Sequence, residues 1–183
     1  MGKVIAGMAM SLDGFINDRN GSVGRLYPDF DALRESDILQ EAIKTTGAVA
    51  MGRGAYDMAQ GDFTGYEFQV PIFVLTHAIP KKVAKGENER LKFTFVTDGI
   101  ESALRQAKAA AGDKNVEVIG GASTVQQCLR AGLVDELQIG LAPVLLGGGT
   151  RFFENTGTQS FELQGTEVIE PHGITYHRIR IIK

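Results

Sequence analysis

Three short segments of the sequence combine glycine or hydroxyl residues with side chains that bind anions, and each directly follows an apolar run. They read GRG at residues 52–54, TH at residues 76–77 and GGAST at residues 120–124. Glycine lets the main chain approach a ligand closely, the planar guanidinium of arginine pairs with phosphate, and the free N–H groups at the start of a helix favour an anion. These residue types could hold a nucleotide by its phosphates.

Each segment also has a simpler interpretation. A glycine pair after a strand often forms a turn, and a single arginine there is often a solvated surface residue. Two common phosphate-binding patterns are missing, because G-x-G-x-x-G does not occur in residues 118–124 and G-x-x-x-x-G-K-[ST] does not occur in the chain. The residues alone therefore leave a strained turn and a ligand contact both open at Gly120 and Gly121.

Strands and helices alternate in the first three quarters of the chain, and they would position these segments. Apolar runs of strand length cover residues 4–10, 48–51, 72–76, 93–97 and 116–119. Apolar residues at three- and four-residue spacing predict helices over residues 31–44, 100–111 and 124–131. This alternation predicts an α/β fold with a parallel sheet, in which ligands bind outside the carboxyl ends of the strands.

The last quarter of the chain changes to period-two alternation, as in Leu137, Ile139 and Leu141. Alternation without an intervening helix predicts antiparallel strands that extend one edge of the sheet. We therefore expect a mixed sheet of about eight strands, with a parallel core and antiparallel C-terminal strands, in one domain over residues 1–183. The exposed edge predicts association into a homodimer. The longest expected loops cover residues 11–29 and 55–71.

The composition of the chain excludes several classes of binding partner. The 183 residues carry a net charge of −3, and the longest basic cluster is Lys81–Lys82, so a nucleic-acid partner is not expected. No stretch approaches the ~20 apolar residues of a membrane span. The single Cys128 excludes an internal disulfide, and His172 and His177 have no acidic pair at ligand spacing, so no metal is expected. These features predict a cytoplasmic protein.

Four ordered motifs carry a family resemblance. VIAGMAMSLDGFI at residues 4–16, MGRGAYD at residues 51–57 and VIGGAST at residues 118–124 resemble dihydrofolate reductase. VDELQIGLAPVLLGGGTRFF at residues 134–153 is similar to the C-terminal reductase domain of the bacterial riboflavin-biosynthesis protein. The chain is identified as resembling the dihydrofolate reductase-like superfamily, in the group of that riboflavin reductase domain, which implies a three-layer fold.

The resemblance implies that NADPH binds along the three turns and a substrate beside it. The implied cofactor residues are Gly52, Arg53 and Ala55 at the ribose phosphate, Thr76 and His77 at the adenosine end, Gly120, Gly121, Ala122, Ser123 and Thr124 at the pyrophosphate, and Ala6, Gly14, Phe15 and Ile16 at the nicotinamide, together with Ile119. The implied substrate residues are Asp13, Leu146 and Gly147. Asp13–Gly14 and the glycines after Leu146 also fit plain turns.

The implied activity is transfer of hydride from NADPH to a C=N or C=O group of a pterin- or pyrimidine-like heterocycle, as in 5-amino-6-(5-phosphoribosylamino)uracil reductase. Asp31 is the candidate proton donor, although it would also serve as a helix N-cap. Two features depart from the family: Ile119 replaces a glutamate typical of riboflavin reductases, and the tryptophan usual in folate reductases is missing from the chain. The alternatives are a non-catalytic nucleotide-binding protein with this fold and a folate reductase of low activity.

Overall fold

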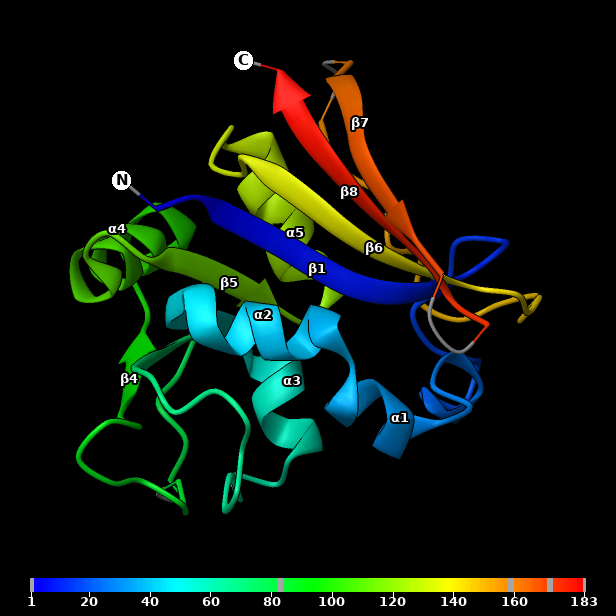
Figure 1. Cartoon of the computed structure of the whole chain (residues 1–183). Helices are drawn as coiled ribbons and strands as arrows, with labels where there is room; N and C mark the ends of the chain where they lie inside the picture. The colour runs from blue at the N-terminus through cyan, green and yellow to red at the C-terminus, as the bar shows by residue number, and fades with distance from the viewer. Residues whose placement is uncertain (1, 82–83, 158–159, 171–172, 183) are drawn as a thin grey trace.

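A computed structural model describes residues 2–81, 84–157, 160–170 and 173–182, and His172 lies outside these ranges. The described strands form one eight-stranded sheet in the order β4-β3-β2-β5-β1-β6-β8-β7 (Figure 1). The strands are β1 (Val4–Ser11), β2 (Thr46–Gly52), β3 (Ile72–Leu75), β4 (Phe93–Val96), β5 (Asn115–Ile119), β6 (Glu136–Ala142), β7 (Glu162–Ile169) and β8 (Thr175–Ile182). The helical segments are η1 (Gly24–Leu26), α1 (Phe30–Glu35), α2 (Asp37–Thr45), α3 (Arg53–Met58), α4 (Ile100–Ala111) and α5 (Ala122–Arg130).

The pairing of the strands confirms the predicted fold class. Strands β4, β3, β2, β5, β1 and β6 pair in parallel, whereas β8 is antiparallel to both β6 and β7. The alternating strand at residues 137–141, which is β6, was predicted to be antiparallel. It is antiparallel to β8 but parallel to β1, so the prediction is wrong for the edge that pairs with β1. Because β5, α5 and β6 form a βαβ unit, the crossover returns β6 parallel to β1, and the antiparallel part begins at β8.

Helices cover both faces of the sheet, which gives the three layers. On one face, buried residues of α4 and α5, such as Leu104 and Val125, pack with Val4 and Ala6 of β1. On the other face, Tyr56 of α3 and residues of α2 pack with Val49 and Met51 of β2. Residues of even and odd number along a strand point to opposite faces, so β2 contributes Ala48 and Ala50 to the first cluster and Val49 and Met51 to the second.

The helix predicted over residues 31–44 is divided in two at Ser36. This residue has extended backbone angles (φ −67°, ψ 144°), and its Oγ accepts a hydrogen bond from the backbone N–H of Leu39 at 3.3 Å. Serine is a favoured N-cap because its oxygen satisfies one of the free N–H groups of the first turn. The 3.6-residue apolar period continues across the break, so the pattern predicted one helix where α1 and α2 are separate.

The segment after β2 begins with a helix and not with the loop predicted over residues 55–71. Helix α3 has six residues, which is too short for an apolar period to be recognised. Its one buried residue is Tyr56, which lies 3% exposed among the aromatic rings of Phe63, Phe93 and Phe95. Aromatic packing in the tertiary structure therefore fixes this helix.

Strand β7 forms the outer edge of the sheet, beyond β8 (Figure 1). Seven of its eight residues are exposed, with Leu163 at 49% and Val168 at 62%. An exposed edge with apolar side chains can pair with another chain. The predicted homodimer stays a prediction that this edge makes reasonable.

Within the part of the chain that the structure describes, no helix is long and apolar enough to cross a membrane. The same residues include no group of three or more His, Cys, Asp or Glu side chains placed to hold a metal ion.

Candidate functional site

A cavity of about 1060 Å³ runs along the carboxyl ends of the parallel strands. The strand order β3-β2-β5-β1 arranges its walls in a row: Thr76 and His77 after β3, the turn at Gly52 after β2, the glycine pair after β5, and Gly7 and Met8 of β1. This volume is at the upper end of the range of about 300–1,000 Å³ that is usual for ligand sites. The three segments singled out by their residue types therefore line one elongated cavity.

The turns after β2 and β5 are held tightly together. The backbone N–H of Gly52 donates to the carbonyl of Gly120 at 2.9 Å. A Cβ on Gly52 would lie 2.3 Å from Oγ1 of Thr124, so the close approach of the two turns requires glycine at position 52. These contacts set the start of α5 against the start of α3.

The start of α5 faces the cavity with main-chain groups. Gly120 has φ +54°, the peptide bond from Gly120 to Gly121 is cis, and Gly121 is the helix N-cap without a side-chain capping bond. Ala122 and Ser123 form the first turn and line the cavity. Because first-turn N–H groups have no partner within their own helix and carry the positive end of its dipole, this wall suits an anion.

Arg53 adds a positive charge to the same wall. Its Nε donates to Asp57 at 2.7 Å and its Nη1 donates to the carbonyl of Ala78 at 3.1 Å. Thr76 is 6% exposed, and its Oγ1 donates to the same Ala78 carbonyl at 2.8 Å. The guanidinium is thus oriented by α3 and by the segment after β3, while its side chain stays 39% exposed.

The loop that follows β1 closes the other end of the cavity. Ile16 lines the cavity, and its backbone N–H donates to the carbonyl of Thr150 at 2.9 Å. Phe15 is 8% exposed and lies under the guanidinium of Arg151 at 4.6 Å. Gly14 has φ +85°, which lets the loop turn back toward β1.

Asp13 joins this loop to the segment after β6. Its carboxylate accepts hydrogen bonds from Oγ of Ser11 at 2.6 Å, from the N–H of Leu146 at 3.1 Å and from the N–H of Gly147 at 2.8 Å. The hydrogen bond from Ser11, with those of the two amides, lowers the pKa of Asp13 to about 2. The three predicted substrate residues therefore form one contact, although none of them lines the cavity.

Substitution of Asp13 by alanine is expected to loosen this contact. The amides of Leu146 and Gly147 would lose their acceptor, so their hydrogen exchange at pH 7 should become faster by about tenfold or more. Since the lowered pKa keeps Asp13 charged, wild-type protection should persist above about pH 4 and weaken as the pH falls toward 2. Hydrogen-exchange mass spectrometry measures both effects.

Asp18 provides the matched control for this measurement. Its carboxylate accepts from the N–H groups of Asn20 and Ser22 within its own loop. Asp18→Ala should therefore leave exchange at Leu146 and Gly147 unchanged. Equal exchange at these two amides in wild type and Asp13→Ala would contradict the bridging role.

Most of the predicted cofactor residues meet at the cavity. Its lining includes Ile16, Gly52, Arg53, Ala55, Thr76, His77, Ile119, Gly120, Gly121, Ala122, Ser123 and Thr124. Ala6, Gly14 and Phe15 do not line it. Ala6 is fully buried in the cluster with α4 and α5, two residues before Met8, which lies on the same face and does line the cavity.

Asp31 does not line the cavity. It is exposed in the first turn of α1, and the N-cap of that helix is Asp29, whose carboxylate accepts from the N–H of Ala32 at 2.9 Å. The interpretation of Asp31 as an N-cap is therefore wrong. Its predicted role as proton donor stays a prediction, and the described lining of the cavity contains no Asp or Glu.

Sequence reasoning missed several lining residues. Tyr27, from the turn after η1, carries a phenol whose pKa is raised by burial, and no spacing in the sequence singles it out. Thr97 and Gly99 follow β4, and the rule of the carboxyl strand ends would have found them. Gly7 and Asn17 directly follow the predicted residues Ala6 and Ile16, and Met8 lies one residue further along β1.

Known proteins match this chain over most of its length. The RibD C-terminal domain family matches residues 2–174 of the chain. Two uncharacterized proteins of Bacillus subtilis (strain 168) are similar in sequence: YyaP is 29% identical over 82% of this chain and 80% of its own length, and YwjB is 26% identical over 82% of each. The family match thus includes every lining residue of the cavity.

Solved structures share the fold. A protein of Shewanella sp. PV-4 named for riboflavin biosynthesis has a TM-score of 0.81, with 22% identity over 99% of both chains. The diaminohydroxyphosphoribosylaminopyrimidine deaminase/5-amino-6-(5-phosphoribosylamino)uracil reductase of Thermotoga maritima has a TM-score of 0.74, with 16% identity over 99% of this chain and 57% of that chain. Dihydrofolate reductase of Enterococcus faecalis, complexed with NADP(H), has a TM-score of 0.68, with 16% identity over 100% of this chain and 98% of its own.

Proposed function

The chain belongs to the RibD C-terminal domain family, and from this premise we propose that it is a reductase that uses NADPH to reduce a C=N or C=O group of a pterin- or pyrimidine-like heterocycle. The observation that carries the proposal is the single cavity in which the glycine pair, Arg53 and Thr76 meet at the carboxyl ends of the strands. The Thermotoga maritima relative is named a reductase and the Enterococcus faecalis neighbour is complexed with NADP(H), which supports the same cofactor.

The described residues fit a dinucleotide phosphate in chemistry and in space. A Cβ on Gly121 would meet no atom within 4 Å, so the main chain there borders open cavity. The first-turn N–H groups of Ala122 and Ser123 would bind the pyrophosphate, and Arg53 would pair with the phosphate on the adenosine ribose. The row of strand ends then leads to Gly7 and Met8, where the nicotinamide would lie.

The residues at the nicotinamide end of the cavity would orient the reacting groups and exclude water from them. NADPH supplies the hydride when it is bound. Met8, Ile16 and Val23 give this end of the cavity apolar walls, which keep solvent from the reacting groups. Tyr27 also lines the cavity. Its phenol is protonated at neutral pH, and burial raises its pKa further above the ordinary value of 10.

The proposed activity can be tested in two steps. Titration with NADPH and NADH, followed by the fluorescence of the reduced nicotinamide, should give saturable binding with preference for NADPH. Oxidation of NADPH is then followed with pterin, pyrimidine and quinone acceptors, and at least one heterocycle should support turnover. Binding without turnover would favour the non-catalytic nucleotide-binding alternative, and lack of binding to either cofactor would contradict the proposal.

Replacement of Arg53 by alanine tests the cofactor assignment. We expect NADPH to bind about 10- to 100-fold more weakly and NADH to change by less than about twofold, because only NADPH carries the additional phosphate. Calorimetric titration measures both constants.

Arg105→Ala is the matched control, since Arg105 is exposed on α4 and bonds Ser102 outside the cavity. This variant should bind both cofactors as the wild type does. A loss of equal size for NADH and NADPH in Arg53→Ala would show that Arg53 does not recognise the phosphate.

A further inference from the structure

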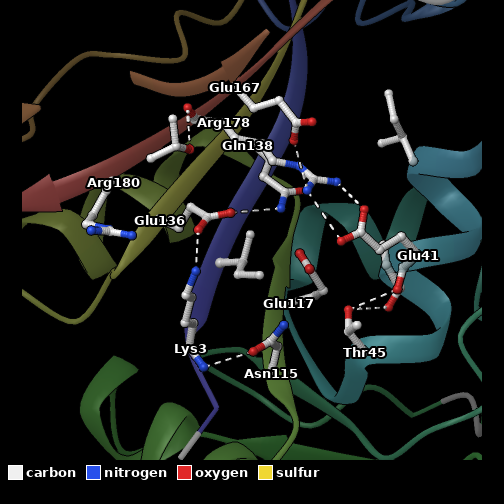
Figure 2. Close-up of a pocket in the computed structure, with 14 residues that line it drawn as sticks. Lys3, Glu41, Thr45, Asn115, Glu117, Glu136, Gln138, Glu167, Arg178 and Arg180 are labelled. Atoms are coloured by element: carbon white, nitrogen blue, oxygen red, sulfur yellow. Dashed lines mark hydrogen bonds and ion pairs between the residues drawn. The ribbon is translucent and has the colours of Figure 1, made fainter. Parts of the chain in front are cut away.

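A second, smaller pocket of about 360 Å³ lies between α2 and the strands β5, β1, β6, β8 and β7 (Figure 2). It shares no described lining residue with the large cavity. The side chain of Glu117 on β5 points into it from the centre of the sheet (Figure 2). A pocket of this volume is near the lower end of the range for ligand sites.

Glu117 is buried without a complete set of partners. The residue is 5% exposed, and its Oε1 has no hydrogen-bond partner among the described groups. Buried polar atoms in native proteins nearly always have a partner, because leaving one unpaired opposes folding. The carboxyl group of Glu117 is therefore an acceptor that a ligand could satisfy.

The charged neighbours of Glu117 are engaged with one another. Lys3 pairs with Glu136 at 2.8 Å, and Gln138 donates to the same carboxylate at 3.1 Å. Arg178 pairs with Glu41 of α2 and, at 3.1 Å, with Glu167 of β7 (Figure 2). These pairs engage Lys3 and Arg178 with carboxylates other than that of Glu117.

The strand register puts two carboxyl groups on one wall. Ile5 of β1 lies opposite Glu117 on one side and opposite Glu136 on the other, so the three residues share one face of the sheet. One step further along the strands, Gly7 lies opposite Ile119 and Gln138. Because Gly7 and Ile119 line the large cavity, the large cavity and the smaller pocket are neighbours on the same face of the sheet.

We propose that this pocket binds a small organic cation with N–H donors, an amidinium or a primary ammonium, and that Glu117 is its main ligand. Such a group donates hydrogen bonds to the free oxygen of Glu117 and balances the charge that a buried carboxylate would carry. An anion would face four carboxyl groups in the lining, those of Glu41, Glu117, Glu136 and Glu167. The described residues provide no cluster of metal ligands here.

The binding should depend on pH. Burial, together with the Glu136 carboxylate, raises the pKa of Glu117 to about 8, so the empty pocket holds a protonated acid at neutral pH. A cation would bind the ionised form and release this proton. The charged groups that face the pocket from the surrounding elements are Lys3, Glu41, Glu136, Glu167, Arg178 and Arg180.

The test uses acetamidine as the cationic probe and acetamide as its neutral counterpart, without NADPH, so that its result is independent of the proposed reductase activity. Ligand-observed NMR titration should give saturable binding of acetamidine that is about tenfold tighter at pH 8.5 than at pH 6.5. Acetamide should bind at least tenfold more weakly.

Variants of Glu117 test whether this residue binds acetamidine. Glu117→Gln keeps the shape of the side chain and should weaken acetamidine at least tenfold at pH 8.5, and Glu117→Met should do the same if the glutamine variant does not fold. Glu162→Gln, an exposed carboxylate on β7 outside both hollows, should bind as wild type. Equal binding by wild type and a folded Glu117 variant, or no saturable binding of acetamidine, would overturn the proposal.

Discussion

Substitution of Gly121 by valine is expected to weaken NADPH binding by at least about 100-fold, which corresponds to about 2.7 kcal/mol. A side chain at this position would enter open space, because an added Cβ meets no atom within 4 Å and Gly121 lines the cavity. Its backbone angles (φ −90°, ψ 178°) are extended and are allowed for valine. The fold should therefore persist while the branched side chain fills the space assigned to the pyrophosphate. Calorimetric titration with NADPH measures the loss.

Gly165→Val is the matched control for this substitution. Gly165 lies on the exposed edge strand β7, an added Cβ there also meets no atom within 4 Å, and the residue lines neither hollow. This variant should bind NADPH as the wild type does. If a folded Gly121→Val protein bound NADPH with unchanged affinity, the start of α5 would not be part of the cofactor site.

The second large expected effect is that the free energy of unfolding depends on pH because of Glu117. Burial raises the pKa of this carboxyl from 4.5 to about 8 in the folded protein. Between these values the folded state keeps a proton that the unfolded state has lost, so the free energy of unfolding falls as the pH rises. The contribution is complete below about pH 4.5 and is lost as the pH rises through 8. Its full size is on the order of 5 kcal/mol, from about 1.4 kcal/mol per pH unit.

Urea unfolding at pH 5 and pH 8.5 measures this effect, and Glu117→Gln isolates it. Glutamine cannot ionise, so the variant should lose several kcal/mol less than the wild type between the two pH values. Glu162→Gln, on the exposed edge strand, should behave as the wild type. The same decrease in wild type and Glu117→Gln would mean that Glu117 is ionised in the folded protein at neutral pH.

The sequence by itself determined the strands and the turns of this protein. Long apolar runs such as that of β1 can be buried only in a sheet covered on both faces, and the helical segments between them impose parallel pairing. Parallel strands place their carboxyl ends at one edge, so Arg53, Thr76 and Gly121 could be predicted to meet before any contact was known. Local residue types and their periods contain this information.

The tertiary structure alone decided the side-chain directions and the irregular elements. Both faces of the central strands are buried, so their sequence does not indicate that Gly7 faces the cavity while Ala6 faces α4 and α5. Tyr56 fixes the short α3 through ring contacts that are distant in sequence. Glu117 lies in a strand whose sequence indicates complete burial. The ion pairs that Lys3 and Arg178 form with other carboxylates explain why neither of them pairs with Glu117. These side-chain directions and contacts depend on residues that are distant in the sequence. A local sequence pattern does not show which of the distant residues make a given contact.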